Sequence, residues 1–337
     1  MGVEQPRERT PQPLPPPLPT WKKLLFSLSL LLFVLGIIEV ALRIRYHDSL
    51  AKHEDKRYLF VRSENARLVY EMRPSHEALY PGTEIQVRTN AAGFRDREFE
   101  PKPPGRFRIA AVGDSVTVGW EVQSDETYPK RLEQLLLTRT GANLDLFNMG
   151  VGGYNSLQEF ELIRTKVLAY EPDLILLGYV LNDGVLWGHD GGATRYFLHS
   201  GCMLWDQIRL RWARLRYRIG EDLVSVAFRD LAQLARDYRV PVLVVVFPYL
   251  DSGGESGYPH QAAHDHVAAL AKQHGFGLLD LLETFRKAGL DTFRARPDDI
   301  IHPNKAGHSL AAEAIAAHLA AQGLVPLPGG ESPAVPR

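Results

Sequence analysis

An apolar run ends in a serine within the segment Phe107-Arg108-Ile109-Ala110-Ala111-Val112-Gly113-Asp114-Ser115-Val116. A short continuous apolar run bounded by turn residues is typical of a buried strand. Reactive side chains of an α/β sheet stand at the carboxyl ends of its strands, so the segment predicts a serine at the functional edge of a sheet. Because Gly-Asp-Ser is also ordinary turn chemistry, this segment alone does not assign a function.

Strand and helix patterns alternate from residue 106 onward, which is typical of a parallel sheet covered by helices. We predict strands at 107–112, 144–148, 173–180, 241–247 and 277–281. Helices are predicted around 126–138, 155–169, 220–237, 259–274 and 303–321. Together these elements predict an α/β domain over residues 106–322 with about five parallel strands.

The composition of the 337 residues is that of an ordinary globular protein, with 45% hydrophobic and 23% charged residues. This length suits a single α/β domain with appendages. The net charge of −1 lacks the basic excess of a nucleic-acid-binding protein, so we expect no nucleic-acid partner. The single cysteine, Cys202, excludes an internal disulfide and a cysteine-rich metal site, and it is expected to be inert.

The N-terminal region contains a long apolar run. Residues 1–20 are rich in proline and charge and predict a disordered tail. The run from Leu24 to Leu42 counts 19 residues, interrupted only by Glu39. At about 1.5 Å per residue it would cross a bilayer core as a helix of about 28 Å. A membrane anchor over 21–43, a cleavable signal peptide and a buried core helix are all compatible with this run. The anchor is favoured, because the residues before Arg43 form a poor cleavage site.

A small β-rich segment and linker are predicted over 44–105, before the α/β domain. Two alternating runs, 67–72 and 84–89, predict short strands separated by a Pro81-Gly82 turn, and long helical periodicity is missing after residue 43. The loop at 90–96 is interpreted as structural rather than catalytic. A proline-rich linker at 101–105 leads into the domain, and residues 323–337 predict a second disordered tail.

Residues 184–219 interrupt the alternation and are rich in aromatic residues and arginine. They include Trp187, Tyr196, Phe197, Trp205, Trp212 and Tyr217, with Arg209, Arg211, Arg214, Arg216 and Arg218. An amphipathic helix packed on the domain is the favoured interpretation. A lid or substrate-binding wall and a membrane-surface contact are the alternatives.

Three further polar clusters stand at the ends of predicted elements. Strand-like runs precede Asn148-Met149-Gly150-Val151-Gly152-Gly153 and Asn182-Asp183, and the helix predicted over 303–321 follows Asp299-Ile300-Ile301-His302. A serine hydroxyl attacks efficiently only when a neighbouring base removes its proton. His302 is the candidate base, because imidazole titrates near neutral pH. Asp299, three residues earlier, can reach the other ring nitrogen. The clusters therefore predict a catalytic set of Ser115, His302 and Asp299.

The four clusters, in this order, resemble the SGNH (GDSL-type) hydrolase family over about residues 90–322. The resemblance implies a flavodoxin-like three-layer α/β/α sandwich. It also implies an oxyanion hole formed by the backbone N–H groups of Ser115 and Gly153 and the side-chain amide of Asn182. The Gly-x-Asn-Asp spacing of the family is longer here, which leaves the role of Gly178 open. No cofactor and no metal are implied.

The expected protein is a membrane-anchored serine esterase. It would cleave acyl esters, O-acetyl esters first, of a small molecule or a polysaccharide through an acyl-enzyme. The precedent of anchored extracytoplasmic hydrolases favours a single-pass anchor with a periplasmic or extracellular domain. The alternatives are an O-acyltransferase acting on cell-envelope or extracellular polysaccharide and a non-catalytic carbohydrate-binding protein on the same fold.

Histidines outside this set are given structural interpretations. His260, His264 and His266 are interpreted as an exposed helix face rather than a metal site, since no third ligand is in place. His308 is expected to pack near the site rather than to act as a second base.

Overall fold

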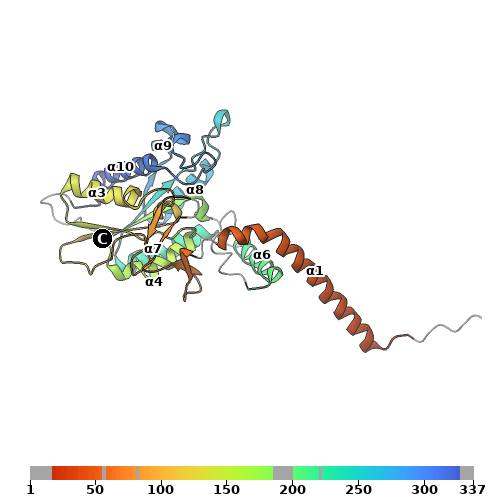
Figure 1. Cartoon of the computed structure of the whole chain (residues 1–337). Helices are drawn as coiled ribbons and strands as arrows, with labels where there is room; N and C mark the ends of the chain where they lie inside the picture. The colour runs from red at the N-terminus through yellow and green to blue at the C-terminus, as the bar shows by residue number, and fades with distance from the viewer. Residues whose placement is uncertain (1–16, 55–57, 81–82, 185–199, 220–221, 327–337) are drawn as a thin grey trace, which may run out of the picture.

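The structure is a computed structural model that describes residues 17–54, 58–80, 83–184, 200–219 and 222–326 (Figure 1). Most of the two tails predicted to be disordered lies outside these residues. The first part of the aromatic insertion, with Trp187, Tyr196 and Phe197, lies outside them as well.

The centre of the molecule is a five-stranded sheet in which every neighbouring pair of strands is parallel. In spatial order its strands are β6 (Leu144–Asn148), β5 (Phe107–Gly113), β7 (Leu174–Val180), β8 (Val242–Phe247) and β9 (Gly277–Asp280). All five predicted strands are confirmed to within one residue at each end. The order is that of flavodoxin-like sheets, and the predicted fold class is confirmed. Every residue of β5, β7 and β8 is buried, as expected for strands covered on both faces.

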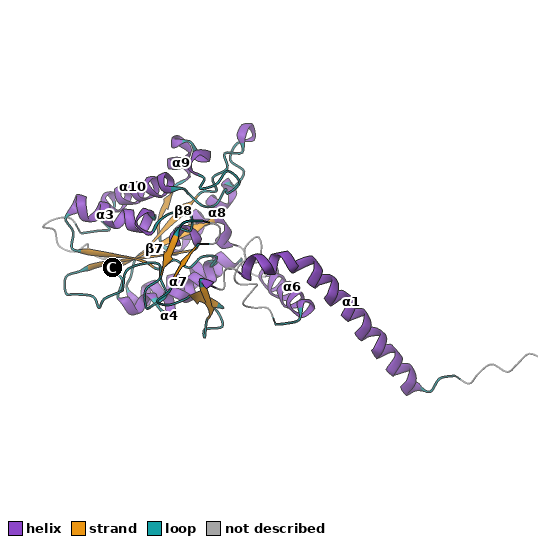
Figure 2. Ribbon diagram, viewed as in Figure 1, coloured by secondary structure: helices purple, strands orange, loops and turns teal. Residues whose placement is uncertain are grey.

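Helices cover both faces of the sheet (Figure 2). One face packs against α3 (Tyr128–Thr140), α9 (Leu282–Ala288) and α10 (Lys305–Ala321). The other packs against α4 (Ser156–Thr165), α7 (Leu223–Tyr238) and α8 (Gln261–His274). The five predicted helices are confirmed in place, although the region 155–169 divides into α4 and a 3₁₀ turn at Val167–Tyr170. The helix α9 was not predicted, and α6 (Met203–Ile219) lies in the insertion.

The N-terminal helix α1 spans Thr20–Glu54 and projects from the body of the domain (Figure 1). Its segment Thr20–Arg45 is long and apolar enough to cross a membrane, and an 18-residue window within it has a mean hydropathy of 2.5. The prediction that long helical structure ends at residue 43 was wrong, because the helix continues to Glu54. A helix that is already nucleated extends at little cost through residues such as alanine, leucine and lysine.

Two antiparallel hairpins follow α1. β1 (Phe60–Arg62) pairs with β2 (Tyr70–Met72), and β3 (Glu77–Leu79) pairs with β4 (Gln86–Arg88). The predicted runs 67–72 and 84–89 contain β2 and β4, but each of these strands pairs with a strand that was not predicted. The Pro81-Gly82 turn lies outside the described residues. Side chains of this segment, including Phe60 and Phe94, are buried in the same hydrophobic core as α4 and α7.

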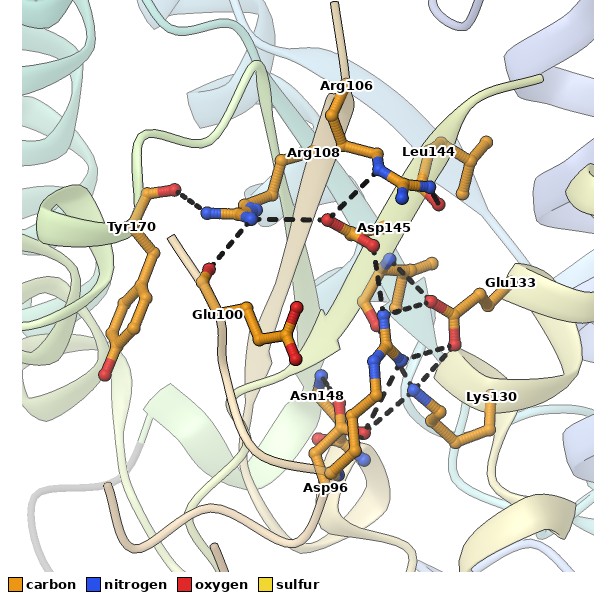
Figure 3. A network of polar contacts seen from close by, with 12 residues as sticks. Asp96, Glu100, Arg106, Arg108, Lys130, Glu133, Leu144, Asp145, Asn148 and Tyr170 are labelled. Carbon is orange, nitrogen blue, oxygen red and sulfur yellow. Dashed lines mark hydrogen bonds and ion pairs between the residues drawn. The ribbon is translucent and has the colours of Figure 1, made fainter. Parts of the chain in front are cut away.

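A network of charged side chains fixes the loop after β4 to the sheet (Figure 3). One oxygen of Asp96 accepts the backbone N–H of Asn148 at 2.7 Å, and the other accepts the Lys130 ammonium at 2.8 Å. The fully buried Arg108 of β5 pairs with Asp145 of β6 at 3.2 Å. The Asp96 contacts hold the loop against the carboxyl end of β6, where the glycine-rich cluster begins, and the Arg108–Asp145 pair joins the starts of the two strands.

Candidate active site

Three side chains from distant parts of the chain form a hydrogen-bonded line at the carboxyl edge of the sheet. Ser115 is the first residue of the short helix α2 (Ser115–Val118), directly after β5, and His302 lies in the loop before α10. The Ser115 Oγ is 2.9 Å from the His302 Nε2, although 187 residues separate them. The His302 Nδ1 is 2.8 Å from an oxygen of Asp299. The structure therefore brings the predicted nucleophile, base and orienting carboxylate together.

Asp299 is held as a carboxylate. Burial by itself raises its pKa, but hydrogen bonds from the His302 ring and from the backbone N–H groups of His302 and Ile301 outweigh it and hold the pKa well below 3.8. A charged Asp299 favours the tautomer in which Nδ1 carries the proton and Nε2 faces the serine hydroxyl.

Two charged residues next to this line were not anticipated from the sequence. The Arg296 guanidinium lies 3.3 Å from Asp299 and 3.2 Å from Glu121, so it bridges the two carboxylates. A carboxylate oxygen of Glu121, a carboxylate oxygen of Asp299 and a ring nitrogen of His302 all lie within 4.8 Å of one another. Glu121 stands in the turn after α2, where no local pattern separates it from an ordinary surface glutamate.

Asp114 connects the serine with the asparagine of the third cluster. One of its oxygens caps α2 by accepting the backbone N–H of Val116 at 2.9 Å. The other accepts the Asn182 amide at 3.0 Å and lies 3.1 Å from the Ser115 hydroxyl. The strand ends of β5 and β7 are therefore linked by a buried carboxylate whose role the sequence analysis missed.

The predicted oxyanion donors occupy loops at this same edge. Asn182 lies in the 3₁₀ turn Leu181–Gly184 after β7, with its amide turned to Asp114. Gly153 lies between β6 and α4 and has a φ of +82°, a conformation that favours glycine. Its loop is tied to the end of β5 by the backbone hydrogen bond from Val151 to Gly113, at 3.0 Å. Oxyanion binding by Ser115, Gly153 and Asn182 stays a prediction.

The role of Gly178, left open by the sequence, is to make room beneath α2, the helix that begins at Ser115. It pairs with Gly113 across β5 and β7. A Cβ at position 178 would lie 2.4 Å from the Tyr128 hydroxyl and 2.7 Å from the Thr117 Oγ1. Those two hydroxyls are 2.9 Å apart and hydrogen-bond to each other, connecting α2 to α3. Any larger residue at position 178 would break this support.

The loop at 90–96 supports the turn after α2, which agrees with its structural interpretation. The Arg95 guanidinium is buried and donates to the carbonyl oxygens of Val118 at 3.2 Å, Val122 at 2.9 Å and Gly119. A fourth bond reaches the carbonyl of Gln86 at 2.9 Å. Burial lowers the pKa of Arg95 to about 10, which leaves the guanidinium charged at neutral pH.

His308 packs beside the site, as expected. It is buried on α10, and its Nδ1 accepts the backbone N–H of Tyr128 at 3.1 Å. Burial, reinforced by the nearby His302, lowers the pKa of His308 to about 3. The imidazole is therefore a neutral hydrogen-bond acceptor at physiological pH.

Two carboxyl groups are buried behind Asp114. Asp183 accepts the backbone N–H of Val180 at 2.6 Å, whereas both oxygens of Glu159 lack a hydrogen-bond partner among the described residues. Burial raises the pKa of each group well above its ordinary value. The charge of Asp114 adds to the effect at both groups, and Glu159 adds to it at Asp183.

The interpretation of the α8 histidines as an exposed face was wrong for His264. Its side chain is buried, with Nε2 3.0 Å from the Tyr258 hydroxyl and Nδ1 2.9 Å from Asp280 at the end of β9. The contact arises because α8 packs directly against β9, a pairing that helical periodicity alone does not reveal. His266 lies on the outer side and pairs with Asp222 at 3.1 Å.

Comparison with protein families finds one match to the chain. The model described as the GDSL-like Lipase/Acylhydrolase family matches residues 111–310. No curated protein matches the chain.

Several solved structures are similar. A two-domain esterase (CEX) active on acetylated mannans shares 18% identity and a TM-score of 0.43, with 68% of this chain and 52% of that chain covered. The acetyl xylan esterase AlAXEase shares 18% identity and a TM-score of 0.45, with 63% and 100% covered. The lipase/acylhydrolase from Enterococcus faecalis shares 17% identity and a TM-score of 0.46, with 67% and 100% covered. The chain thus spans about half the length of the two-domain esterase.

Proposed function

The chain belongs to the GDSL-like lipase/acylhydrolase family of SGNH serine hydrolases, and we propose that it hydrolyses acyl esters with Ser115 as the nucleophile. In this proposal His302 is the general base and Asp299 orients it. The observation that carries the proposal is the continuous pair of hydrogen bonds, 2.9 Å from Ser115 to His302 and 2.8 Å from His302 to Asp299.

The reaction proceeds in two steps. The Ser115 Oγ attacks the ester carbonyl carbon while its proton moves to the His302 Nε2. The tetrahedral intermediate collapses to an acyl-enzyme, and the alcohol leaves with the proton from His302. A water molecule then attacks the acyl carbon, gives its proton to His302 and releases the carboxylic acid. Ser115 recovers its proton from the imidazolium.

The negative oxygen of each intermediate is bound by the backbone N–H groups of Ser115 and Gly153 and by the Asn182 amide. An amide nitrogen carries two donors. One N–H of Asn182 can therefore stay on Asp114, at 3.0 Å, while the other faces the oxyanion. Fixed donors of this kind typically contribute about 10²–10³ each in rate.

We further propose a short acyl group, O-acetyl first, on a small molecule or a polysaccharide. Ser115 is only 7% exposed, and Arg296 and Glu121 crowd the same edge, which favours a small acyl part. The apolar helix α1 serves as a single-pass anchor that holds the domain on the periplasmic or extracellular side. Its most apolar window is 0% buried against the rest of the chain, as a lipid-facing segment requires.

The test uses the full chain in mild detergent with p-nitrophenyl esters of increasing acyl length. We expect turnover to be highest with acetate and to be lost in Ser115→Ala. A fluorophosphonate should label the wild type once and should not label Ser115→Ala, as read by intact mass. The matched control is Ser124→Ala, which removes an exposed hydroxyl nine residues away.

Equal turnover in wild type and Ser115→Ala would overturn the assignment of the nucleophile. If ester turnover is weak and acetyl transfer to an added sugar acceptor is strong, the protein is an acyltransferase that uses the same serine. A folded wild type that neither reacts with the phosphonate nor turns over ester would support the binding-only alternative.

A further inference from the structure

The charge that interrupts the apolar run has a partner in a distant part of the chain. Glu39 accepts the backbone N–H groups of Met203 at 3.0 Å and Leu204 at 2.8 Å. These residues begin α6, so the Glu39 carboxylate caps the N-terminus of a helix more than 160 positions further along the chain. Backbone N–H groups at a helix start carry a partial positive charge and stabilise a carboxylate there.

A second side chain of α1 strengthens this contact. Arg43, one turn after Glu39, lies 2.8 Å from the Glu39 carboxylate and donates to the carbonyl oxygen of Gly201 at 2.5 Å. Figure 1 shows α6 lying beside the end of α1 that is nearest the domain. Glu39 and Arg43 together clamp the beginning of α6 to the last turns of the apolar segment.

The contacts of Glu39 and Arg43 with the start of α6 determine how far α6 lies from the centre of a membrane that α1 crosses. Six residues separate Glu39 from Arg45, where the apolar segment ends, which corresponds to about 9 Å along a helix. An acidic side chain this close to the end of a spanning segment lies at the depth of the bilayer interface. At that depth backbone N–H groups or water can donate hydrogen bonds to its carboxylate. The start of α6 is therefore held at the same depth.

The outward face of α6 has the composition of an interfacial helix. Trp205, Ile208 and Trp212 are 51%, 38% and 68% exposed, and their spacing places them along one stripe of the helix. Arg209 and Arg211 are exposed on the same helix. Tryptophan concentrates at membrane interfaces, and arginine pairs with anionic headgroups.

We propose that α6 lies on the surface of the bilayer that α1 crosses, with its Trp205-Ile208-Trp212 stripe in the interfacial layer of an anionic phospholipid membrane. This proposal rests on α1 being the anchor. Because α6 follows the Asn182 end of β7 in sequence, the contact would hold the domain in a defined orientation on the membrane. Of the three interpretations given for the insertion, this proposal corresponds to the membrane-surface contact.

The experiment places fluorescent probes on the full chain in vesicles of phosphatidylcholine and phosphatidylglycerol. Cys202→Ser removes the native thiol, and a cysteine introduced by Trp212→Cys is labelled with the polarity-sensitive dye NBD. Quenching is measured with lipids spin-labelled near the headgroup, with lipids spin-labelled in the middle of the acyl chain, which reach position 30, and with aqueous iodide. Leu137→Cys on α3, which is 42% exposed, is the matched control. Leu30→Cys within the apolar segment of α1, 52% exposed, reports the anchor itself.

We expect lipid quenching at position 212 at least about threefold stronger than at position 137, and lipid quenching at position 30 as well. Glu39→Ala should reduce lipid quenching at position 212 at least about twofold without changing it at position 30. Glu39→Gln keeps one acceptor oxygen, so we expect its lipid quenching at position 212 to lie between that of wild type and that of Glu39→Ala.

Two results would overturn the proposal while leaving the anchor in place. In one, position 30 is lipid-quenched and position 212 is reached only by iodide. In the other, position 212 is protected from both quenchers, as it would be beneath a protein partner or folded over the active site. Lipid quenching at neither position would overturn the anchor together with the proposal.

Discussion

Replacing Glu159 by glutamine is expected to stabilise the protein at neutral and alkaline pH. The Glu159 side chain is 1% exposed in the first turn of α4, and its two oxygens accept no hydrogen bond from the described residues. Burial, together with repulsion from Asp114, raises its pKa well above 4.5. The folded protein therefore binds a proton at this site that the unfolded chain releases near pH 4.5.

The sign and size of the effect follow from this difference in proton binding. Above pH 4.5 the native state holds one more proton than the unfolded state, so stability falls as pH rises until the pKa of the folded state is reached. One proton corresponds to about 1.4 kcal/mol per pH unit. Glutamine has nearly the shape of the protonated acid and carries no proton to lose. Glu159→Gln should remove this slope and gain at most about 1.4 kcal/mol over wild type for each pH unit above 4.5.

The assay is urea unfolding of the full chain in mild detergent, followed by fluorescence, at several pH values from about 5 to about 8. The control is Glu313→Gln, which neutralises a half-exposed carboxylate paired with Arg139. Its free energy of unfolding should stay within about 0.5 kcal/mol of wild type at every pH. If the stability of Glu159→Gln ran parallel to that of wild type across this range, the inference of a buried, protonated Glu159 would be refuted.

Three further substitutions test the site. Asp299→Asn should lower kcat by about 10³–10⁴-fold with little loss of stability, because an amide no longer selects the His302 tautomer; a drop under about tenfold would contradict the assigned role. Asn182→Ala should lower kcat by about 10²–10³-fold with a smaller change in KM, and an unchanged kcat would exclude it from the oxyanion hole. Arg95→Ala should lower the free energy of unfolding by at least about 3 kcal/mol, since three buried carbonyls and one partly buried carbonyl lose a charged donor. A cost below about 1 kcal/mol would show that the turn after α2 does not depend on Arg95.

Local sequence patterns were enough to predict the sheet and the hydrogen-bonded line of Ser115, His302 and Asp299. Strands buried on both faces are continuous apolar runs, so β5, β7 and β8 can be identified without knowing what covers them. The line from Ser115 to His302 follows from the same logic, because parallel strands present their carboxyl ends at one edge. Residues separated by 187 positions were therefore expected to meet there.

Contacts that depend on which elements pack together could not be predicted from short-range sequence patterns. The short hairpin strands carry three residues each, too few for alternation to identify their partners, so the pairings of β2 and β4 were missed. The burial of His264 was misjudged, and that of Glu159 was not anticipated, for a related reason. Glu159 and His264 look like ordinary exposed helix residues until α4 and α8 are packed against the sheet and its neighbours.

The amino-acid sequence by itself predicted the five strands and five helices of the α/β domain, the family, and the meeting of Ser115, His302 and Asp299, because each of these follows from short-range patterns. Only the tertiary structure decided that Asp114 joins Ser115 to Asn182 and that Gly178 leaves space for the Thr117–Tyr128 bond. It alone also decided that Glu39 caps a helix in the insertion. Such contacts depend on the distance between chemically ordinary side chains, which is set only when the whole chain has folded.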